Sequence, residues 1–319
     1  MAAVETVEVL NSGLLTTVQD LGRVGFGRYG VPASGALDAF ALRVGNLLVD
    51  NSERAAGLEI TLAGLRVKIL VDAAVAVTGA DLDCRLNGKP LRQWCVHHLK
   101  SSDILEFSRL KHGCRAYLAV GGGLAVPAVM GSRSTNTGSR FGGLMGRPLR
   151  SGDVLSVESP HLHLTRRGRS FDHNSVPAHS DYRRLRVLPG PQFDHFSDVA
   201  ADRFLNSDYR VSPQSDRTGI RLKGEGIHVR DGLPESIISE GIMAGAVQIP
   251  GDGQPIIILN ETVSGGYRKI AAVIAADLHL LGQLLPGDRV GFEAVDLREA
   301  REALWRVEEK IARLRNTLA

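Results

Sequence analysis

The stretch LRVKILVDAAVAVTG, residues 65–79, holds two runs of Val, Ile, Leu and Ala that one aspartate separates. Short runs of such residues, bounded by Gly, Pro, Asn or Asp, are typical of β-strands. The same composition recurs outward along the chain. The further strand candidates are VETVEVL (4–10), RAYLAVGGG (115–123), VLSVES (154–159), LRVLPG (185–190) and IIIL (256–259). This pattern predicts a mainly β protein.

Helical periodicity is limited to a few segments, so we expect some α structure beside the strands. Apolar spacings of three and four residues mark ALDAFALRVGNLL (36–48), SDVAADRFL (197–205) and AAVIAADLHLLGQLL (271–285). The clearest helix is C-terminal, where Asp296 and Glu299 can form a capping box. Its apolar stripe comprises Leu297, Ala300, Leu304, Val307, Ile311, Leu314 and Leu318. We expect this stripe to pack mainly on the preceding lobe, with an interface between chains as the alternative.

One small pattern recurs as SSDILEF (101–107), SGDVLSV (151–157) and PGDRVGF (286–292). Each copy has a small residue or Pro, a Ser-Asp or Gly-Asp pair, and then alternating apolar residues. Because an Asp side chain accepts hydrogen bonds from nearby backbone, each copy is predicted to be a turn that starts a strand. The repetition favours two related β-rich halves, unless the Asp turn is simply a common one.

A polar stretch at residues 158–184 divides the chain, because it has little apolar periodicity, two prolines and four of the ten histidines. The predicted parts are an N-terminal β-rich lobe (1–157), a linker (158–184), a C-terminal lobe (185–295) and a C-terminal helix (296–319). His161 and His163 could start a metal site in the linker. Two histidines without a third placed ligand are a weak signal, so we expect a solvated linker and no metal.

Composition excludes several classes of protein. The net charge of +3 is small and no basic face is clustered, so nucleic acid is not an expected partner. The three cysteines, Cys84, Cys95 and Cys114, have no CxxC spacing and are typical of reduced thiols in a cytoplasmic protein. The N-terminus carries no signal-peptide pattern, and no run of 18 apolar residues occurs, so no membrane partner is expected.

No Walker-type phosphate loop, dinucleotide fingerprint, nucleophile elbow, zinc-protease motif or biotin attachment site occurs in the sequence. Chemistry is therefore expected in polar loops that combine Gly with hydroxyl, carboxylate or guanidinium groups. They are TTVQDLGR (16–23), GVPASGALD (30–38), GSRSTNTGSRFGG (131–143), SDRTGIRLKG (215–224) and SGGYRKIA (264–271). Such loops can converge on a small anion or amide. One loop alone is ordinary turn chemistry, whereas five in one chain favour a binding site.

These loops also carry a resemblance to a known family. The ordered motifs are GLLTTVQDLGRVGFGRYGVPASGALD (13–38), GCRAYLAVGGG (113–123), GSRST (131–135), FGG (141–143), VLPGPQ (187–192), SDRTGIRL (215–222) and QIPGDGQPIII (248–258). Together they resemble the allophanate hydrolase subunit 2 family, from about residue 9 to residue 296. That family includes the C subunit of bacterial 5-oxoprolinase, the KipA proteins and the carboxyltransferase region of urea carboxylase.

The resemblance implies two cyclophilin-like β-barrel lobes and a cytoplasmic complex that opens 5-oxoproline to glutamate, or cleaves a related amide such as allophanate. In that complex this chain binds no cofactor alone and ATP is used by the whole. The implied partners are a protein that resembles KipI or the B subunit of 5-oxoprolinase, and a LamB/YcsF-like protein. One alternative is carboxyl transfer to urea-like substrates, with biotin supplied by another chain. Another is a non-catalytic KipA-like regulator that binds a kinase inhibitor.

The resemblance and the polar loops together give the predicted site for a small amide or carboxylate. Asp20 or Asp38 would act as acid or base, while Arg133 and Arg217 would hold a carboxylate or developing anion. The glycines of the 131–143 loop would let backbone approach the ligand. The predicted substrate-binding residues are Ser34, Ser132, Ser134, Thr135, Gly142, Gly143, Asp216, Gly265, Gly266, Tyr267 and Lys269.

One segment departs from the family pattern. Members read about Asp-x-Gln-Thr-Thr-Gly-Gly-Tyr-Pro, whereas residues 260–268 of this chain read Asn-Glu-Thr-Val-Ser-Gly-Gly-Tyr-Arg. The Asp-Gln pair and the Pro are absent, and the loop is one residue shorter. Glu261 is the candidate replacement for the acid. The departure slightly favours the regulatory alternative.

Overall fold

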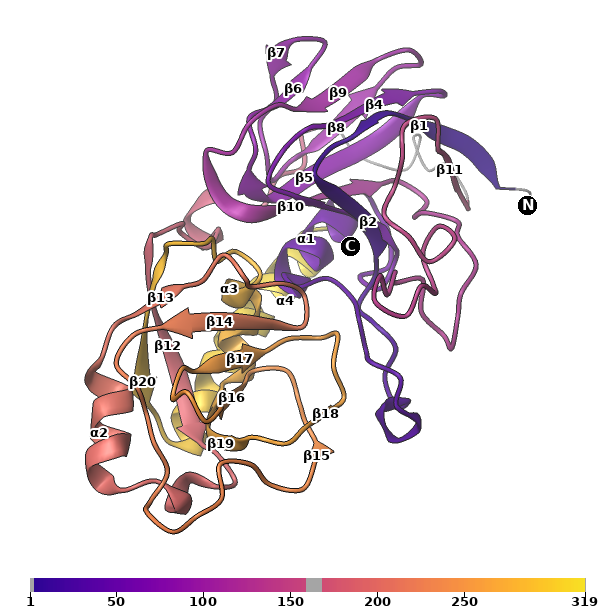
Figure 1. The fold of residues 1–319 in the computed structure, drawn as a ribbon. Coiled ribbons are helices and arrows are strands. Elements are labelled where there is room, and N and C mark those ends of the chain that lie inside the picture. The colour runs from indigo at the N-terminus through magenta and orange to yellow at the C-terminus, as the bar shows by residue number, and fades with distance from the viewer. Residues whose placement is uncertain (1–2, 159–167, 319) are drawn as a thin grey trace. The chain divides into compact units, whose positions relative to one another are not determined.

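The structure is a computed structural model that describes residues 3–158 and 168–318 (Figure 1). Contacts divide the chain into two compact units. Unit 1 comprises Met1–Arg23, Ser34–His179 and Lys310–Ala319, and unit 2 comprises Val24–Ala33 and Ser180–Glu309. The change of unit at Ser180 falls inside the segment 158–184 that the sequence predicts as a linker. His161 and His163, the candidate metal ligands, lie outside the described residues.

Unit 1 contains two β-sheets, ordered β11-β1-β4-β9-β6-β7 and β2-β3-β10-β5-β8. The first has β1 (Val4–Ser12), β4 (Leu65–Ile69), β6 (Cys84–Leu86), β7 (Lys89–Pro90), β9 (Ile104–Phe107) and β11 (Val154–Val157). The second has β2 (Leu15–Gln19), β3 (Gly57–Thr61), β5 (Ala73–Asp81), β8 (Val96–Leu99) and β10 (His112–Val120). The mainly β class expected from the sequence is confirmed.

The stretch 65–79 joins these two sheets. Its first run is β4 and its second run is β5, so the chain passes from one sheet to the other at Asp72. Alternate residues of a strand share one face, and Val67 of β4 and Val75 of β5 lie in the same buried cluster. The two apolar runs therefore build the core between the sheets from both sides.

Helix α1 (Ala39–Leu48) packs on β5 and β10 (Figure 1). It begins at Asp38, whose side chain accepts a hydrogen bond from Ala41 N at 2.8 Å, as N-cap residues do. Thr78 of β5 donates to Ala41 O at 2.7 Å. A Cβ at Gly45 would lie 3.1 Å from Thr78 Oγ1, so this glycine lets the helix approach the sheet closely. The 3-10 turn η1 is Gly27–Tyr29.

Unit 2 is a closed barrel with strand order β12-β19-β16-β17-β14-β13-β20. The strands are β12 (Tyr182–Pro189), β13 (Tyr209–Val211), β14 (Gly219–Lys223), β16 (Ala246–Ile249), β17 (Ile256–Ile258), β19 (Arg268–Val273) and β20 (Arg289–Ala294). A two-stranded ribbon of β15 (Glu240–Gly241) and β18 (Ser264–Gly265) is separate from the barrel. Helix α2 (Asp198–Asn206) packs on β20, where Phe204 stacks on Phe292 at 4.3 Å between ring centroids.

The prediction of a helix over residues 271–285 is wrong for most of that segment. Residues 271–273 belong to β19, and only η4 (Ala275–Asp277) and α3 (Leu278–Leu281) are helical. Ala271 pairs with Val247 of β16 and with Pro189 of β12, so the barrel ladders override the local helical spacing. Two further 3-10 turns are η2 (His173–Ser175) in unit 1 and η3 (Phe193–His195) in unit 2.

The recurring Asp turn has the same geometry in all three places. Asp103 Oδ2 accepts from Lys100 N at 2.7 Å, Asp153 Oδ2 from Arg150 N at 2.7 Å, and Asp288 Oδ2 from Leu285 N at 2.8 Å. Each turn leads directly into a strand, namely β9, β11 or β20. The prediction of a turn that starts a strand is confirmed at each copy.

Helix α4 (Leu297–Leu318) is the predicted C-terminal helix. Its capping box is present, because Asp296 N donates to Glu299 Oε2 at 2.8 Å and Glu299 N donates to Asp296 Oδ1 at 2.7 Å. Ala300 and Ala303, rather than Leu297 and Leu304, are buried at the start of the helix. Small alanines allow a close approach to the buried Ile274 and Ala276, and the larger leucines remain on the exposed side.

The expectation that the stripe packs mainly on the second lobe agrees with the first part of α4. Residues up to Glu309 are grouped with unit 2, and residues from Lys310 onward are grouped with unit 1. Ile311 and Leu314 are buried, and Arg315 forms an ion pair with Glu53 of unit 1. In the part of the chain that the structure describes, no helix has both the length and the apolar character needed to cross a membrane.

Candidate functional site

The polar loop at residues 131–143 is built around the buried carboxylate of Asp20, which follows β2 directly. Asp20 Oδ1 accepts hydrogen bonds from the Ser134 hydroxyl, from the Ser132 hydroxyl at 2.7 Å and from Gly22 N at 2.7 Å. Its Oδ2 accepts from Arg133 N at 2.6 Å. Asp20 therefore anchors this loop, and its role as acid or base stays a prediction.

Three loops that are far apart in the sequence meet beside Asp20. Gln19 donates to Thr135 O at 3.1 Å and accepts from Gly35 N at 3.1 Å. Asn136 donates to the Ser34 hydroxyl at 3.2 Å. Ser34 has a φ of 54°, a left-handed conformation that a non-glycine residue adopts at a cost in energy. The fold thus brings together four of the predicted binding residues, Ser34, Ser132, Ser134 and Thr135.

Gly142 and Gly143 have a steric role in the fold of this loop. A Cβ at Gly142 would lie 2.1 Å from Ser134 O, and a Cβ at Gly143 would lie 1.9 Å from Thr135 Oγ1. Their φ angles are 69° and 53°, which side chains rarely adopt. These glycines are needed so that the loop can fold against itself. Their expected function of admitting a ligand to the backbone stays a prediction.

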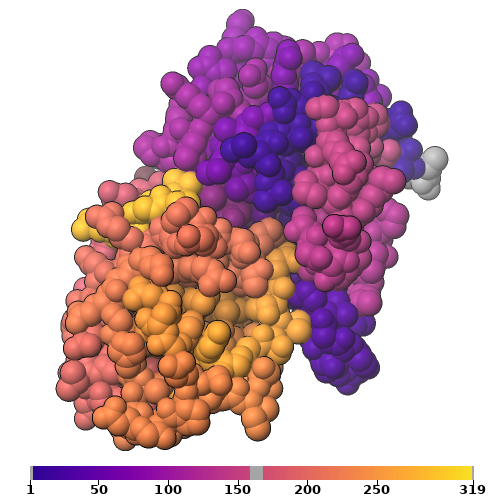
Figure 2. All heavy atoms as spheres, viewed as in Figure 1, coloured from indigo at the N-terminus to yellow at the C-terminus, as the bar shows by residue number. Residues whose placement is uncertain are grey.

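Arg133 leaves the same loop and holds it to two other segments. Its Nε donates to Val126 O at 2.8 Å, and its guanidinium pairs with Glu158. The Arg133 side chain is still 32% exposed. Residues 138–140, the tip of the same loop, are exposed. Figure 2 shows the magenta atoms of this region at the surface of unit 1.

Asp38, the other predicted acid or base, is the N-cap of α1 and is buried. Its backbone N donates to the Tyr117 hydroxyl at 2.8 Å, and that hydroxyl donates to Glu59 Oε2 at 2.8 Å. Burial first, and then the negative charge of Glu59, raise the pKa of Tyr117 well above its usual value. Tyr117 therefore stays neutral, accepts from the N-cap residue of α1 and donates to Glu59.

In unit 2, Arg217 forms a buried ion pair with Glu261, the residue in the altered segment. Arg217 Nε lies 3.2 Å from Glu261 Oε1, and each side chain is 7% exposed. Glu261 thus balances the charge of Arg217. Asp216 is exposed, and its Oδ1 accepts from Thr218 N at 2.7 Å and from Gly219 N at 3.1 Å, which makes it the organiser of a turn.

Lys269 is buried and its ammonium pairs with Glu240 of the β15–β18 ribbon. Gln192 links the two residues, because its Nε2 donates to Glu240 Oε1 at 2.8 Å and its Oε1 accepts from Lys269 N at 3.1 Å. Hydrogen bonds from Lys269 first and Gln192 second hold the pKa of Glu240 below its usual range. A Cβ at Gly265 would lie 2.3 Å from Gln248 Nε2, so a glycine is needed here to leave space for the buried amide of Gln248.

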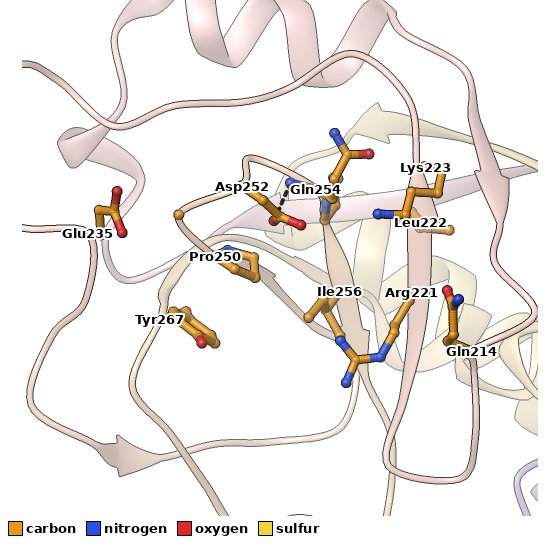
Figure 3. Close-up of a pocket in the computed structure, with 12 residues that line it drawn as sticks. Gln214, Arg221, Leu222, Lys223, Glu235, Pro250, Asp252, Gln254, Ile256 and Tyr267 are labelled. Carbon is orange, nitrogen blue, oxygen red and sulfur yellow. Dashed lines mark hydrogen bonds between the residues drawn. The ribbon is translucent and has the colours of Figure 1, made fainter.

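A groove of about 820 Å³ lies within unit 2 (Figure 3). Tyr267 borders it and is the one predicted site residue among its lining. The neighbouring Gly266 lies near Ser239 instead, whose Oγ would be 3.2 Å from an added Cβ. The full lining is Gln214, Arg221, Leu222, Lys223, Glu235, Pro250, Gly251, Asp252, Gln254, Pro255, Ile256 and Tyr267.

Several polar residues of these clusters escaped the sequence prediction. Gln19 had a local signal, because it stands beside Asp20 in the TTVQDLGR loop. Gln192 ends the VLPGPQ motif (187–192), but nothing in the sequence linked it to Lys269. Glu240 had no signal, since it lies in none of the motifs and 48 residues separate it from Gln192. Among the described residues, no group of three or more His, Cys, Asp or Glu side chains is arranged to hold a metal ion.

Known proteins are similar in sequence to this chain over most of its length. A family model described as carboxyltransferase domain, subdomain A and B, matches residues 29–294. The C subunit of the Escherichia coli 5-oxoprolinase is 38% identical over 298 residues, which are 93% of this chain and 94% of that protein. The C subunit of the Haemophilus influenzae 5-oxoprolinase is 34% identical over 295 residues, which are 92% and 93% of the two chains.

Larger enzymes contain a similar region. The crystal structure of the K. lactis urea amidolyase superposes with a TM-score of 0.90 and 32% identity, covering 98% of this chain. This chain spans only 20% of that protein. The expected resemblance and the barrel-containing, mainly β fold are therefore confirmed.

Proposed function

Because this chain belongs to the carboxyltransferase domain family, subdomains A and B, we propose that it is one component of a 5-oxoprolinase-type complex. The observation that carries this proposal is the alignment with the C subunit of the E. coli 5-oxoprolinase, at 38% identity over 93% of this chain and 94% of that protein. The complex opens 5-oxoproline to glutamate with ATP. In the cytoplasm, reducing conditions suit the three buried free thiols.

In the proposed reaction, ATP transfers a phosphoryl group to the lactam oxygen, and water then attacks the lactam carbon. The ring C–N bond breaks, the nitrogen takes up a proton, and glutamate, ADP and phosphate leave. Such a reaction needs a group that stabilises the negative charge that develops on the oxygens bound to this carbon. The Arg133 guanidinium supplies this charge in our proposal, and Asp20 positions the loop by accepting from the backbone N–H of Arg133.

Companion chains supply the remainder of the site in this proposal. They comprise a protein that resembles KipI or the B subunit of 5-oxoprolinase, together with a LamB/YcsF-like protein, and ATP is used by the assembled complex. The two bacterial relatives are named as subunits, which supports an assembly of several chains. The proposed ligand is a small lactam that carries a carboxylate.

The test is co-expression of this chain with the proteins encoded beside its gene, followed by an assay for glutamate released from 5-oxoproline and ATP. We expect release from the complete set and loss of release when this chain is omitted. Arg133→Lys is the matched variant, since it keeps the charge but loses the planar guanidinium. Glutamate release that does not depend on this chain would contradict the proposal.

Carboxyl transfer to a urea-like substrate is the second candidate, because the matching family model carries that name and the K. lactis urea amidolyase contains a similar region. It requires a biotin carrier on another chain. Incubation with carboxybiotin and urea distinguishes it from the first candidate. Consumption of carboxybiotin only when urea and this chain are both present would favour carboxyl transfer.

A further inference from the structure

The groove of unit 2 has cations at one end and acidic and aromatic groups at the other. Figure 3 shows Arg221 and Gln214 at one end, Glu235 and Tyr267 at the other, and Asp252 between them. From this order we infer that the groove binds a nucleoside polyphosphate with its phosphates at the Arg221 end. The inference departs from the expectation that this chain binds no cofactor alone, and it rests on the proposed function only in assigning this chain a share of the ATP that the complex uses.

The cationic end is formed by Arg221 and Lys223 of β14. They stand at alternate positions of one strand, so both side chains point to the same face, roughly 7 Å apart. Both are exposed, and within residues 3–158 and 168–318 neither has an ion-pair partner. Two charged donors at this spacing can contact successive phosphates of a polyphosphate chain, since Arg and Lys bind phosphate oxygens by charge-assisted hydrogen bonds.

The middle of the groove carries groups suited to a ribose. Asp252 lies on the turn after β16, and its Oδ1 accepts from Gln254 N at 3.1 Å. Gln254 in turn exchanges two hydrogen bonds with the backbone of Gly224, at 2.9 and 3.2 Å, which fixes this rim. Carboxylates accept hydrogen bonds from ribose hydroxyls in nucleotide sites. We therefore place the ribose, with its two hydroxyl donors, beside Asp252.

The far end suits a planar base. Tyr267 is 41% exposed and borders the groove, so its ring offers a stacking surface. Glu235 lies against Gly251, where an added Cβ would be 2.4 Å from Glu235 Oε2. A carboxylate seated in this way can accept a hydrogen bond from the exocyclic amine of adenine. Pro250 and Ile256 supply apolar contact between the two ends.

The volume of the groove suits a nucleotide better than a single amino acid. Sites for ligands of drug size have volumes of about 300–1,000 Å³, and the groove has about 820 Å³. Glutamate would fill a small part of it and would leave Tyr267 uncovered. A nucleotide uses the cationic end, the carboxylates and the aromatic end together.

Calorimetric titration of the purified full chain with ATP and Mg²⁺ tests the inference. We expect binding that weakens in the order ATP, ADP, AMP, because each lost phosphate removes a contact with Arg221 or Lys223. The double variant R221Q/K223Q should weaken ATP binding at least tenfold. Arg210→Gln is the matched control, since Arg210 is an exposed arginine on β13 that pairs in register with Lys223 but does not line the groove.

The aromatic end has its own test. Tyr267→Ala should weaken ATP binding severalfold and leave binding of inorganic tripolyphosphate unchanged. Equal affinity for ATP and tripolyphosphate in the unaltered chain, tighter binding of glutamate or of an acidic peptide than of ATP, or no response to R221Q/K223Q would each overturn the inference. All these readouts are binding to the isolated chain, so they stand apart from glutamate release by the complex.

Discussion

Asp20 accepts four hydrogen bonds with a single buried carboxylate, two from hydroxyls and two from backbone N–H groups. A carboxylate has no donor of its own when ionised, so it can hold several converging donors that would otherwise repel each other. Ser132, Arg133 and Ser134 are consecutive, and all three bond to it. The shape of the 131–143 loop thus depends on one residue that lies more than 100 positions earlier.

Replacement of Asp20 tests this dependence. Asp20→Ala leaves buried hydroxyl and N–H donors without their acceptor, at about 1–3 kcal/mol for each group, so we expect a loss of about 4 kcal/mol in the free energy of unfolding. Urea denaturation measures it. Asp216→Ala is the control, because Asp216 accepts two backbone hydrogen bonds in an exposed turn and should cost less than about 1 kcal/mol. Full stability with lost activity would instead assign Asp20 to the chemistry.

The altered segment at residues 260–268 is tested through its buried ion pair. Glu261→Gln leaves Arg217 buried without its carboxylate, and we expect the free energy of unfolding to fall by about 3 kcal/mol. The double variant R217Q/E261Q should be less destabilised than the two single variants added together. Denaturant unfolding of all four proteins gives the coupling energy. Strict additivity would mean that the two side chains do not stabilise each other.

At the scale of elements, local hydrogen bonds in turns and caps precede several strands and helices. The turn before β11 joins Asp153 to the Arg147 guanidinium, through two hydrogen bonds of 2.8 Å, and to Arg150 N. The bonds from Arg147 first, and then the one from Arg150 N, hold the pKa of Asp153 below its usual value even though burial opposes the shift. Stability at this turn is therefore linked to pH.

The pH dependence has a definite sign. A carboxyl group whose pKa is lowered in the folded state contributes its full stability above the unfolded value of about 3.9 and loses it as pH falls through the folded value. We expect Asp153→Asn to lower stability by about 1.5 kcal/mol at pH 7, with the difference from the unaltered chain shrinking below about pH 4. Melting curves between pH 7 and 3 measure it. Arg147→Gln should show the same trend, and a difference that stays constant with pH would contradict the linkage.

Helix α4 offers a matched pair of large side chains. Ile311 is fully buried, and Ile311→Ala should reduce the free energy of unfolding by about 3 kcal/mol through lost burial and the cavity left behind. Trp305 is 77% exposed, so Trp305→Ala should change it by less than about 0.5 kcal/mol. Thermal melting of both variants distinguishes the two faces. An equal effect at both positions would mean that Trp305 is covered in solution by another chain.

At the scale of the whole molecule, the proposed reaction needs more than this chain. The sequence has no phosphate-loop motif, and the two bacterial relatives that match over nearly their full length are named as subunits. We expect the purified chain alone to bind nucleotide but to release no glutamate from 5-oxoproline and ATP. A coupled glutamate assay with a sensitive blank measures this. Turnover by the isolated chain would show that it holds the complete site.

Features that depend on neighbouring residues follow from the sequence alone. The Asp turns form before β9, β11 and β20, and the capping box forms at Asp296 and Glu299, because each needs only partners within a few positions. The runs at 65–79 form β4 and β5 as their composition predicts, although the strands that pair with them are distant in the sequence. The order of the loop motifs likewise identified the family. Local spacing failed at residues 271–273, where pairing with distant strands decided the outcome.

The partners of the predicted site residues, by contrast, depend on the tertiary structure. Asp20 meets Ser134 across 114 positions, and Lys269 meets Glu240 across 29. At Gly142 and Gly143, atoms of the same loop fill the space that a side chain would take. A buried polar group must find its partner wherever the fold places one. Residue types therefore indicated which loops are polar, whereas tertiary packing decided which side chains hold each other and which still face solvent.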